Sequence, residues 1–357
     1  MTHSIHVTEP ATTPGDRSVI GWDIGGANTK AVAMDREHGA PPRFRAGSAP
    51  LAMERDWASL VPGLRRLATA VGPRTGVHAV TMTAELSQAF RTKREGVTFV
   101  LDAMEDAFPG EVIRVFTVAG EFLDPAEARL RPLEVAAANW AATARFVGRD
   151  MPDCLLVDVG TTTTDIIPIT GGEPATMGLT DPERLLSGEL VYTGAVRTPV
   201  ESVAATVPLW GRHCPLVPEG FALMGDVYLW LGALDARDYA SSPPDGRPAT
   251  REFAGERLAR AVCADAEMLD EDAVGAIARA LAEAQVERVT AGIKRVHARH
   301  PRLRLTVVTG LGDFIAAEAV RRTSLDLRPL AERLGDAART APAAAVASLL
   351  ADAIAPA

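Results

Sequence analysis

Residues 20–30 of the chain have the sequence IGWDIGGANTK. The hydrophobic side chains around Trp22 predict a buried strand that ends near Asp23, and the AVAMD segment after Lys30 predicts a second strand. Between the two strands, Gly25 and Gly26 let backbone N–H groups approach an anion without a Cβ in the way. A carboxylate beside such a turn suits an anion that arrives with Mg²⁺. Taken alone, the hairpin is weak evidence, because most such hairpins are ordinary turns.

The same design returns in residues 155–169, LLVDVGTTTTDIIPI. A hydrophobic strand runs into Asp158, a turn follows with Gly160 and four threonines, and Asp165 begins the next strand. A third segment, residues 306–315 (TVVTGLGDFI), predicts a strand, a glycine turn and the start of a helix, which favours anion binding. Together the three segments predict two related lobes, each of which directs an aspartate and a glycine turn toward a shared cleft.

In this order, the three segments resemble the phosphate-1, phosphate-2 and adenosine motifs of the acetate and sugar kinase, Hsp70 and actin superfamily. The resemblance implies an α/β protein with the two-lobed ribonuclease H-like fold of actin-like ATPases and sugar kinases, with a central ligand cleft. Longer matches lie in GWDIGGANTK, VTMTAELSQAF, VDVGTTTTDIIPI and GELVYTGAVRTPV. These resemble the hydantoinase/oxoprolinase-like proteins of one-carbon metabolism, a group that includes enzymes of methanofuran and methylofuran biosynthesis.

The closer resemblance implies a transferase that depends on Mg²⁺. It would join an (aminomethyl)furanylmethyl diphosphate to the phenol oxygen of γ-glutamyltyramine, or of a tyrosine relative, and release diphosphate. Two alternatives stay open. One is an ATP-dependent kinase or a hydantoinase/oxoprolinase-like amidohydrolase, which the TGLGDF segment favours, and the other is a non-catalytic nucleotide-gated scaffold. The sequence does not distinguish ATP from the diphosphate of the substrate as the occupant of the cleft.

Carboxylates, hydroxyls and one lysine are the candidate site residues. We expect Asp23 and Asp158 to hold a hydrated Mg²⁺ and Lys30 to stabilise negative charge on the leaving oxygen. Asp165 is a candidate general base, and the alternative is that it orients Thr162. The candidate phosphate- or nucleotide-binding residues are Gly25, Gly26, Ala27, Asn28, Thr29, Gly160, Thr161, Thr162, Thr163, Thr164, Gly310, Gly312 and Asp313.

A second polar region follows a predicted strand over residues 77–82. Ligands of α/β proteins bind where strands end, which makes the residues beyond this strand candidates for substrate contact. A solvated loop with ordinary charges is the alternative interpretation. With two residues from the GELVYTGAVRTPV segment, the candidate substrate-binding residues are Thr83, Glu85, Lys93, Glu189 and Arg197.

Composition limits the partners. Of the 357 residues, 47% are hydrophobic, which is enough for two lobes with cores of their own. A net charge of −9 argues against nucleic acid as a partner, because affinity for polyanions comes from Lys and Arg, but it allows a small phosphorylated substrate. No hydrophobic run reaches the roughly 18 residues of a membrane span, and the N-terminus lacks a signal pattern. Three cysteines without paired spacing favour a reducing, cytoplasmic location. A homo-oligomer is left open.

The predicted organisation has four parts. Residues 1–17 are expected to form a disordered leader, 18–150 an N-terminal lobe with the phosphate-1 motif, and 151–324 a C-terminal lobe with the phosphate-2 and adenosine-type motifs. Residues 325–357 are expected to form a helical tail that folds back onto the first lobe, as the superfamily resemblance implies. Hydrophobic spacing predicts the longer helices at 56–71, 96–108, 133–147, 222–234, 250–268 and 270–299.

Overall fold

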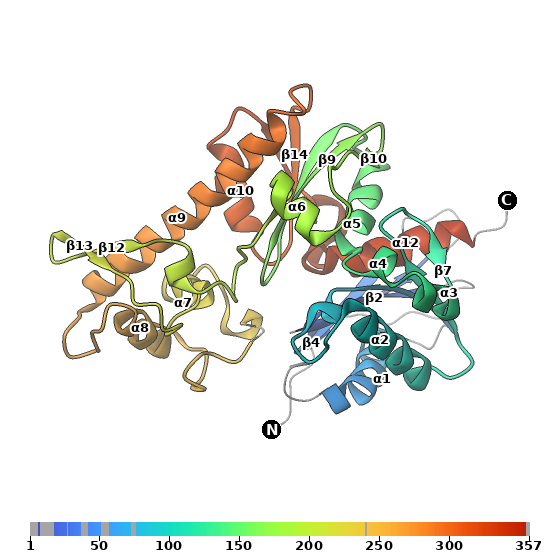
Figure 1. Cartoon of the computed structure of the whole chain (residues 1–357), viewed down its shortest axis with the longest axis horizontal. Helices are drawn as coiled ribbons and strands as arrows, with labels where there is room; N and C mark the ends of the chain where they lie inside the picture. The colour runs from blue at the N-terminus through green and yellow to red at the C-terminus, as the bar shows by residue number, and fades with distance from the viewer. Residues whose placement is uncertain are drawn as a thin grey trace. The chain divides into compact units, whose positions relative to one another are not determined.

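A computed structural model of the chain describes residues 6–7, 18–26, 28–36, 42–50, 57–72, 76–239 and 241–354 (Figure 1). The chain forms two compact units. The first consists of Met1–Asp153, Ile169–Asp181 and Leu330–Ala357, and the second of Cys154–Pro168 and Pro182–Pro329. These bounds differ from the predicted ones, because Ile169–Asp181 and the tail from Leu330 belong to the first unit. Of the predicted leader, only residues 6–7 lie within the described residues.

The first unit is built on a mixed sheet with the strand order β1-β4-β3-β2-β5-β6-β7. Its strands are β1 (His6–Val7), β2 (Ser18–Ile24), β3 (Asn28–Asp35), β4 (Arg43–Pro50), β5 (Val77–Met82), β6 (Val112–Phe116) and β7 (Phe122–Leu123). Strand β2 pairs antiparallel with β3, which confirms the first predicted hairpin. It pairs in parallel with β5, so the C-terminal ends of β2 and β5 meet at one edge of the sheet.

Two of the helices predicted for this unit are present, over 57–71 and 93–107, whereas the helix over 125–130 was not predicted. The helices of the unit are η1 (Trp57–Ser59), α1 (Leu60–Val71), η2 (Ala84–Leu86), α2 (Lys93–Ala107), α3 (Pro125–Leu130), α4 (Pro132–Val135), α5 (Asn139–Gly148), α11 (Ala331–Leu334), η5 (Gly335–Thr340) and α12 (Ala341–Ala353). The helix predicted over 133–147 is two helices. Between them Ala137 has φ 51°, and its N–H donates to Met82 O at 3.1 Å, so the backbone leaves the helix to bind the end of β5.

Strand β2 is covered on both faces. Trp22 and its neighbours Ile20 and Ile24 pack into the core that α1 and α2 share. On the other face Gly21 lies against α12, because a Cβ at this position would be 2.0 Å from Ala343 O. The C-terminal helix therefore packs directly on β2, as expected. The prediction of an all-helical tail is wrong for β15 (Asp326–Pro329), which is a strand of the second unit.

The second unit contains the sheet order β9-β8-β14-β15, with β11 paired to β9. Its strands are β8 (Cys154–Val159), β9 (Thr164–Thr170), β11 (Leu190–Val191), the hairpin of β12 (Thr206–Leu209) and β13 (Arg212–Pro215), β14 (Leu305–Thr309) and β15. The last residues of β9 pair with β10 (Glu173–Pro174) in the first unit. Strands β8 and β14 are parallel, and Asp158 is in register with Thr309. The turns that follow these two strands therefore lie together at one edge of the sheet.

The helices of the second unit surround its core and pack along one long helix. They are α6 (Asp181–Ser187, whose first residue belongs to the first unit), η3 (Val200–Ser202), α7 (Met224–Trp230), η4 (Ala236–Asp238), α8 (Arg251–Arg260), α9 (Glu271–His297) and α10 (Asp313–Arg321). Figure 1 shows α9 as the long orange helix, which contacts α7, α8 and α10. Helix α8 ends at Arg260, earlier than predicted, and α10 begins at Asp313 as predicted. None of the helices in the described part of the chain is long and apolar enough to cross a membrane.

Candidate functional site

Three polar side chains lie side by side in the first unit, on β3, β2 and β5. Lys30 and Thr81 are the registered partners of Asp23 on the two neighbouring strands. Lys30 Nζ lies 3.3 Å from Asp23 Oδ2. Asp23 is 5% exposed, and within the described residues neither its Oδ1 nor Thr81 Oγ1 has a hydrogen-bond partner. Because unpaired buried polar atoms cost stability, this arrangement favours a ligand that completes their hydrogen bonds.

The predicted glycine turn follows this row. Gly25 N–H donates to Asn28 O at 3.1 Å, and a Cβ on Gly25 would be 2.7 Å from the same oxygen, so the tight turn needs glycine here. Gly26 has open space around it. Asn28 Oδ1 and Thr29 Oγ1 are buried without a hydrogen-bond partner in the part of the chain that the structure describes. Ala27, also predicted to bind phosphate, lies outside the described residues.

The second polar region also belongs to the first unit. Thr83 N–H donates to Ile24 O at 2.9 Å, which holds the segment after β5 against the glycine turn of β2. Two residues further on, the Glu85 side chain is 1% exposed. Lys93, in the first turn of α2, places its Nζ 3.6 Å from Glu85 Oε1 and 2.7 Å from Asp181 Oδ2. Three charged groups thus form a cluster beside the hairpin, which an ordinary solvated loop would not give.

Burial changes the acidity of Glu85. Removal from water penalises the charged form and raises the pKa of this carboxyl from 4.5 to about 7. The positive charge of Lys93 opposes the shift, and the negative charge of Asp181 adds to it. Glu85 therefore changes its charge near neutral pH, which few carboxyl groups do.

In the second unit, the adenosine-type segment packs on the end of β8. Asp158 is 8% exposed. Gly310 has φ +95°, and a Cβ there would be 2.3 Å from Asp158 Oδ1, so the turn lies directly against the carboxylate. Gly312 N–H donates to Val159 O at 2.8 Å. Both glycines are thus needed for this close packing, and Asp313 begins α10 immediately after it.

The threonine turn is braced by the segment after β11. Gly160 N–H closes the turn on Thr163 O at 2.9 Å, and the backbone N–H groups of Val196 and Arg197 donate to Thr161 O at 3.0 and 2.9 Å. The buried Thr164 donates from Oγ1 to Thr193 O at 2.7 Å, which is a structural contact. Thr161, Thr162 and Thr163 are half-buried, and so is Arg197.

Two predicted site carboxylates have structural partners. Arg184, 1% exposed, donates to Asp165 Oδ1 at 2.6 Å. Glu189 is fully buried and accepts from Ser187 Oγ at 2.9 Å and from Arg299 Nη2 at 3.3 Å. These contacts favour a role in holding β9 and β11 together. The roles of Asp165 as a base and Glu189 as a substrate contact stay predictions.

Sequence reasoning missed Asp181 and Thr81. Asp181 could not be recognised from the sequence, since its contact with Lys93 joins residues 88 positions apart. One signal was available in the sequence. The chain has three lysines among its 37 basic residues, and two of them, Lys30 and Lys93, are paired with carboxylates at this sheet edge. A scarce residue type that occurs once on β3 and once at the start of α2, each time beside a carboxylate, points to a need for compact positive charge.

The residues present can be compared with what a bound Mg²⁺ requires. Within the described residues, no group of three or more His, Cys, Asp or Glu side chains could hold a metal ion. Mg²⁺ needs fewer protein ligands, because it is commonly held through one or two carboxylates, waters and phosphate oxygens. The unpaired Oδ1 of Asp23 fits that mode. Asp23 belongs to the first unit and Asp158 to the second, so a metal shared by both stays a prediction.

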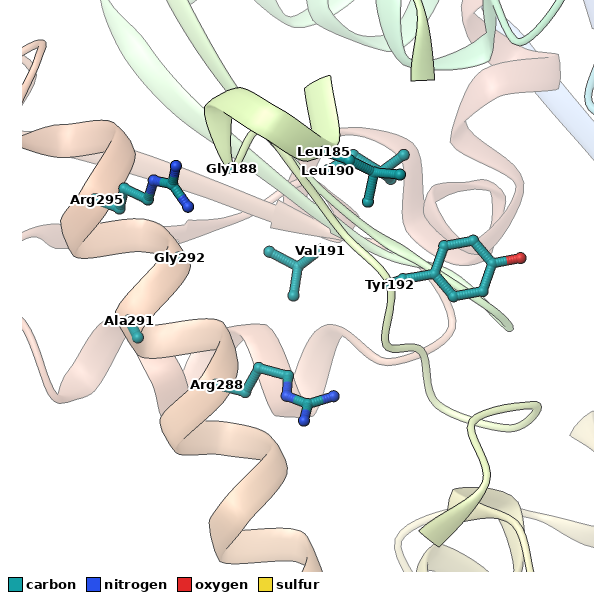
Figure 2. Close-up of a pocket in the computed structure, with 9 residues that line it drawn as sticks. All are labelled: Leu185, Gly188, Leu190, Val191, Tyr192, Arg288, Ala291, Gly292 and Arg295. Atoms are coloured by element: carbon teal, nitrogen blue, oxygen red, sulfur yellow. The ribbon is translucent and has the colours of Figure 1, made fainter. Parts of the chain in front are cut away.

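A separate pocket of about 330 Å³ lies in the second unit between α6, β11 and α9. Figure 2 shows Arg288 and Arg295 projecting from α9 on either side of Val191. Both guanidinium groups donate to backbone carbonyls, at Ser202 O (2.5 Å) and Leu186 O (2.8 Å). These bonds brace the segments around β11, which continues into the turn that supports the threonines.

Comparison with known proteins places the chain in a family. The hydantoinase/oxoprolinase family model matches residues 76–353. The chain belongs to the hydantoinase/oxoprolinase family. The match covers Glu85, Lys93, the threonine turn and the glycines of β14–α10, and the resemblance inferred from the motifs is thereby confirmed.

Two curated relatives share one name. The (4-{4-[2-(gamma-L-glutamylamino)ethyl]phenoxymethyl}furan-2-yl)methanamine synthase of Methanocaldococcus jannaschii is 36% identical over 334 residues, covering 93% of this chain and 97% of the relative. The synthase of the same name from Methanococcus vannielii is 32% identical over 213 residues, covering 58% of this chain and 95% of the relative. This member of the hydantoinase/oxoprolinase family is thus similar to a synthase over nearly its whole length.

Among solved structures, nucleotide-free acetone carboxylase matches with a TM-score of 0.53 and 12% identity, covering 92% of this chain and 70% of that chain. At this identity the likeness concerns the fold. It agrees with the predicted fold class, two α/β units of the actin-like ATPase and sugar kinase type, which is confirmed.

Proposed function

We propose that this protein forms the aryl–alkyl ether of a methanofuran-type cofactor precursor. The observation that carries the proposal is the 36% identity over 93% of the chain to a synthase whose product contains a phenoxymethyl group on a furan ring. This group contains an aryl–alkyl ether bond. The same bond forms when the phenol of γ-glutamyltyramine displaces diphosphate from an (aminomethyl)furanylmethyl diphosphate. The protein is accordingly a transferase that acts on small molecules.

The reaction is a substitution at the methylene carbon and needs no oxidant or reductant. The phenol oxygen bonds to the methylene carbon, the bond from that carbon to the diphosphate oxygen breaks, and its electron pair leaves with the diphosphate. The phenol proton passes to a base of the protein. The electron-rich furan ring spreads the positive charge that develops on the methylene carbon, so a strong nucleophile is not required. The main task of the protein is then to stabilise the negative charge on the departing diphosphate.

Groups of the first unit suit the departing diphosphate. Lys30 provides a positive charge that Asp23 orients at 3.3 Å. The Thr29 hydroxyl, which has no hydrogen-bond partner within the described residues, is suited to donate to a phosphate oxygen, whereas the unpaired Asn28 Oδ1 only accepts and suits a water bound to the metal. Fixed donors directed at developing negative charge account for a large share of catalysis in such reactions.

In the second unit the half-buried hydroxyls of Thr161, Thr162 and Thr163 are the proposed phosphate contacts, and Asp158 is the proposed metal contact. We propose Mg²⁺ as the metal, which would neutralise charge on the diphosphate when bound. Gly310 and the backbone groups around Thr161 keep this turn in place.

The test is direct. Purified protein is incubated with the furanylmethyl diphosphate, γ-glutamyltyramine and Mg²⁺, and the ether is sought by mass spectrometry while free diphosphate is measured. The proposal expects one diphosphate for each ether. Folded protein and authentic substrates that give no ether would overturn it.

ATP belongs to the same test as a separate arm. The acceptor and donor already balance, so ATP is expected neither to be hydrolysed nor to be required. Hydrolysis of ATP that depends on either substrate would instead support the kinase or amidohydrolase alternative. A cytoplasmic location and self-association stay predictions, to be measured by fractionation and by the molecular mass in solution.

A further inference from the structure

Glu85 carries a buried carboxylate that the phosphate-binding turns do not use. Its side chain is 1% exposed, and within the described residues neither Oε1 nor Oε2 has a hydrogen-bond partner. Buried carboxylates are normally hydrogen-bonded, so a carboxylate whose one close polar contact among the described residues is the Lys93 ammonium at 3.6 Å requires an explanation. A role in accepting a proton from a ligand would explain why this carboxylate is left without a closer hydrogen-bond partner in the described part of the chain.

The backbone fixes Glu85 beside the proposed diphosphate site. Thr83, two residues earlier, is bound to Ile24 O, and its Oγ1 would be 3.4 Å from a Cβ on Gly25. On the other side α2 approaches closely, because a Cβ on Gly96 would be 2.6 Å from Glu85 Cα. Glu85 is therefore held between the glycine turn of β2 and the first turn of α2.

The charged groups that face Glu85 come from the two elements beside it. Lys93 on α2 lies between Glu85 Oε1, at 3.6 Å, and Asp181 at the start of α6, at 2.7 Å. The Lys93 ammonium lies closer to Asp181 than to Glu85, so it neutralises only part of the negative charge of Glu85. The Lys93 and Asp181 side chains are 22% and 18% exposed, and they form the solvent side of the cluster.

We propose that Glu85 is the general base that removes the phenol proton of the acceptor, and that Lys93 and Asp181 set its basicity. The inference rests on the proposed function. As the phenol oxygen bonds to the methylene carbon and diphosphate leaves with the electron pair of the broken bond, the proton moves to a Glu85 carboxylate oxygen. The inference requires the phenol to approach this oxygen past Lys93 and Asp181, whose side chains form the solvent side of the cluster.

The acidity of Glu85 suits this task. Burial brings its pKa to about 7, and a base works best when its pKa lies near the working pH. Asp165, the base expected from the sequence, is instead ion-paired with the buried Arg184. Protonation of Asp165 would remove the negative charge that faces this buried guanidinium at 2.6 Å, which is costly.

The first experiment replaces the base by its neutral isostere. With wild-type protein making the ether, Glu85→Gln is expected to lower kcat by about 10²–10⁴-fold, the usual contribution of a general base. A ring-fluorinated γ-glutamyltyramine, whose phenol loses its proton more easily, should restore much of the rate in the variant and change the wild-type rate little. A merely structural role for Glu85 would not give this selective rescue.

The second experiment changes the pKa of Glu85 by substituting its charged neighbours Asp181 and Lys93. Wild-type activity should rise with pH through about 7 as Glu85 loses its proton. Asp181→Asn removes a charge that raises the pKa of Glu85 and should shift this limb to lower pH. Lys93→Met removes a charge that lowers it and should shift the limb to higher pH. These variants also decide the question if Glu85→Gln does not fold.

Stability gives an independent check. Because the pKa of Glu85 is raised in the folded state above its value of 4.5 in the unfolded chain, the unfolded state binds fewer protons between these values, and stability falls as pH rises from about 4.5 through about 7. Glu85→Gln lacks this loss, so its Tm should exceed that of the wild type most clearly at pH 8.

The outcomes separate the two proposals. If the wild type makes no ether, the proposed function fails. If the wild type makes ether, but Glu85→Gln keeps its rate and its pH limb, or the Asp181 and Lys93 variants leave the limb in place, only the assignment of Glu85 fails. Selective rescue by the acidic phenol, together with opposite shifts of the limb, supports it.

Discussion

Replacing Lys30 by Met tests the positive charge next to Asp23. The ammonium lies 3.3 Å from the carboxylate oxygen, and at an effective dielectric of about 20 Coulomb's law gives an attraction of about 5 kcal/mol. Lys30 is 20% exposed, and its desolvation offsets part of that attraction. We expect the variant to lose about 2–3 kcal/mol of unfolding free energy, below the usual loss on breaking a fully buried pair.

The catalytic effect should be separate from this loss. If the charge acts on the leaving diphosphate, Lys30→Met lowers kcat by about 10²–10³-fold at temperatures where the variant is folded. The assay is ether formation under single-turnover conditions, with urea unfolding on the same samples. Lys30→Arg, which keeps the charge, should retain more activity, and Lys294→Met, at an exposed position on α9, serves as the matched control.

A double variant distinguishes the two roles. In Asp23→Asn with Lys30→Met, the unpaired buried carboxylate is gone, so stability should recover relative to Lys30→Met while the rate stays low. A Lys30→Met variant that turns over at nearly the wild-type rate, with only its stability reduced, would refute a role of this lysine in catalysis.

Three further predictions concern the second unit and the metal. Gly310→Ala should lose about 2–4 kcal/mol in urea unfolding, because its Cβ would meet Asp158 Oδ1 at 2.3 Å at a φ of +95°; Gly26→Ala, which has open space, should change stability little, and equal losses would contradict the argument. Asp165→Asn should lose about 3–5 kcal/mol, because it removes the negative charge 2.6 Å from the buried Arg184 guanidinium, yet it should keep most of its kcat when folded. An unchanged Tm with a lost rate would make Asp165 the base instead. Chelation of divalent ions should stop ether formation, and added Mg²⁺ should restore it; full activity in chelator would contradict the metal proposal.

Much of the fold could be predicted because its signals are local. The glycine turn after Asp23, the threonine turn after Asp158 and the start of α10 at Asp313 all lie within short stretches whose hydrophobic pattern and turn residues agree. The helix break at Ala137 was missed, because the break depends on a hydrogen bond to the distant end of β5. Local propensity favoured a continuous helix there, and tertiary contact prevailed.

The candidate site divides in the same way. Residue types at strand ends identified Asp23, Lys30, Glu85 and Lys93, because ligands meet α/β sheets at that edge. The contact of Lys93 with Asp181 could not be predicted, since nothing local to either residue indicates the other. The burial of Glu85, which separates a base from an ordinary surface carboxylate, likewise appears only when α2 closes over η2.

The central claim is that the chain joins a phenol to a furanylmethyl carbon with loss of diphosphate. The decisive measurement is the stoichiometry of ether and diphosphate produced from the authentic diphosphate, γ-glutamyltyramine and Mg²⁺ without ATP. Equal amounts of both products are expected. Folded protein that yields no ether, or yields it only while hydrolysing ATP, would contradict this claim.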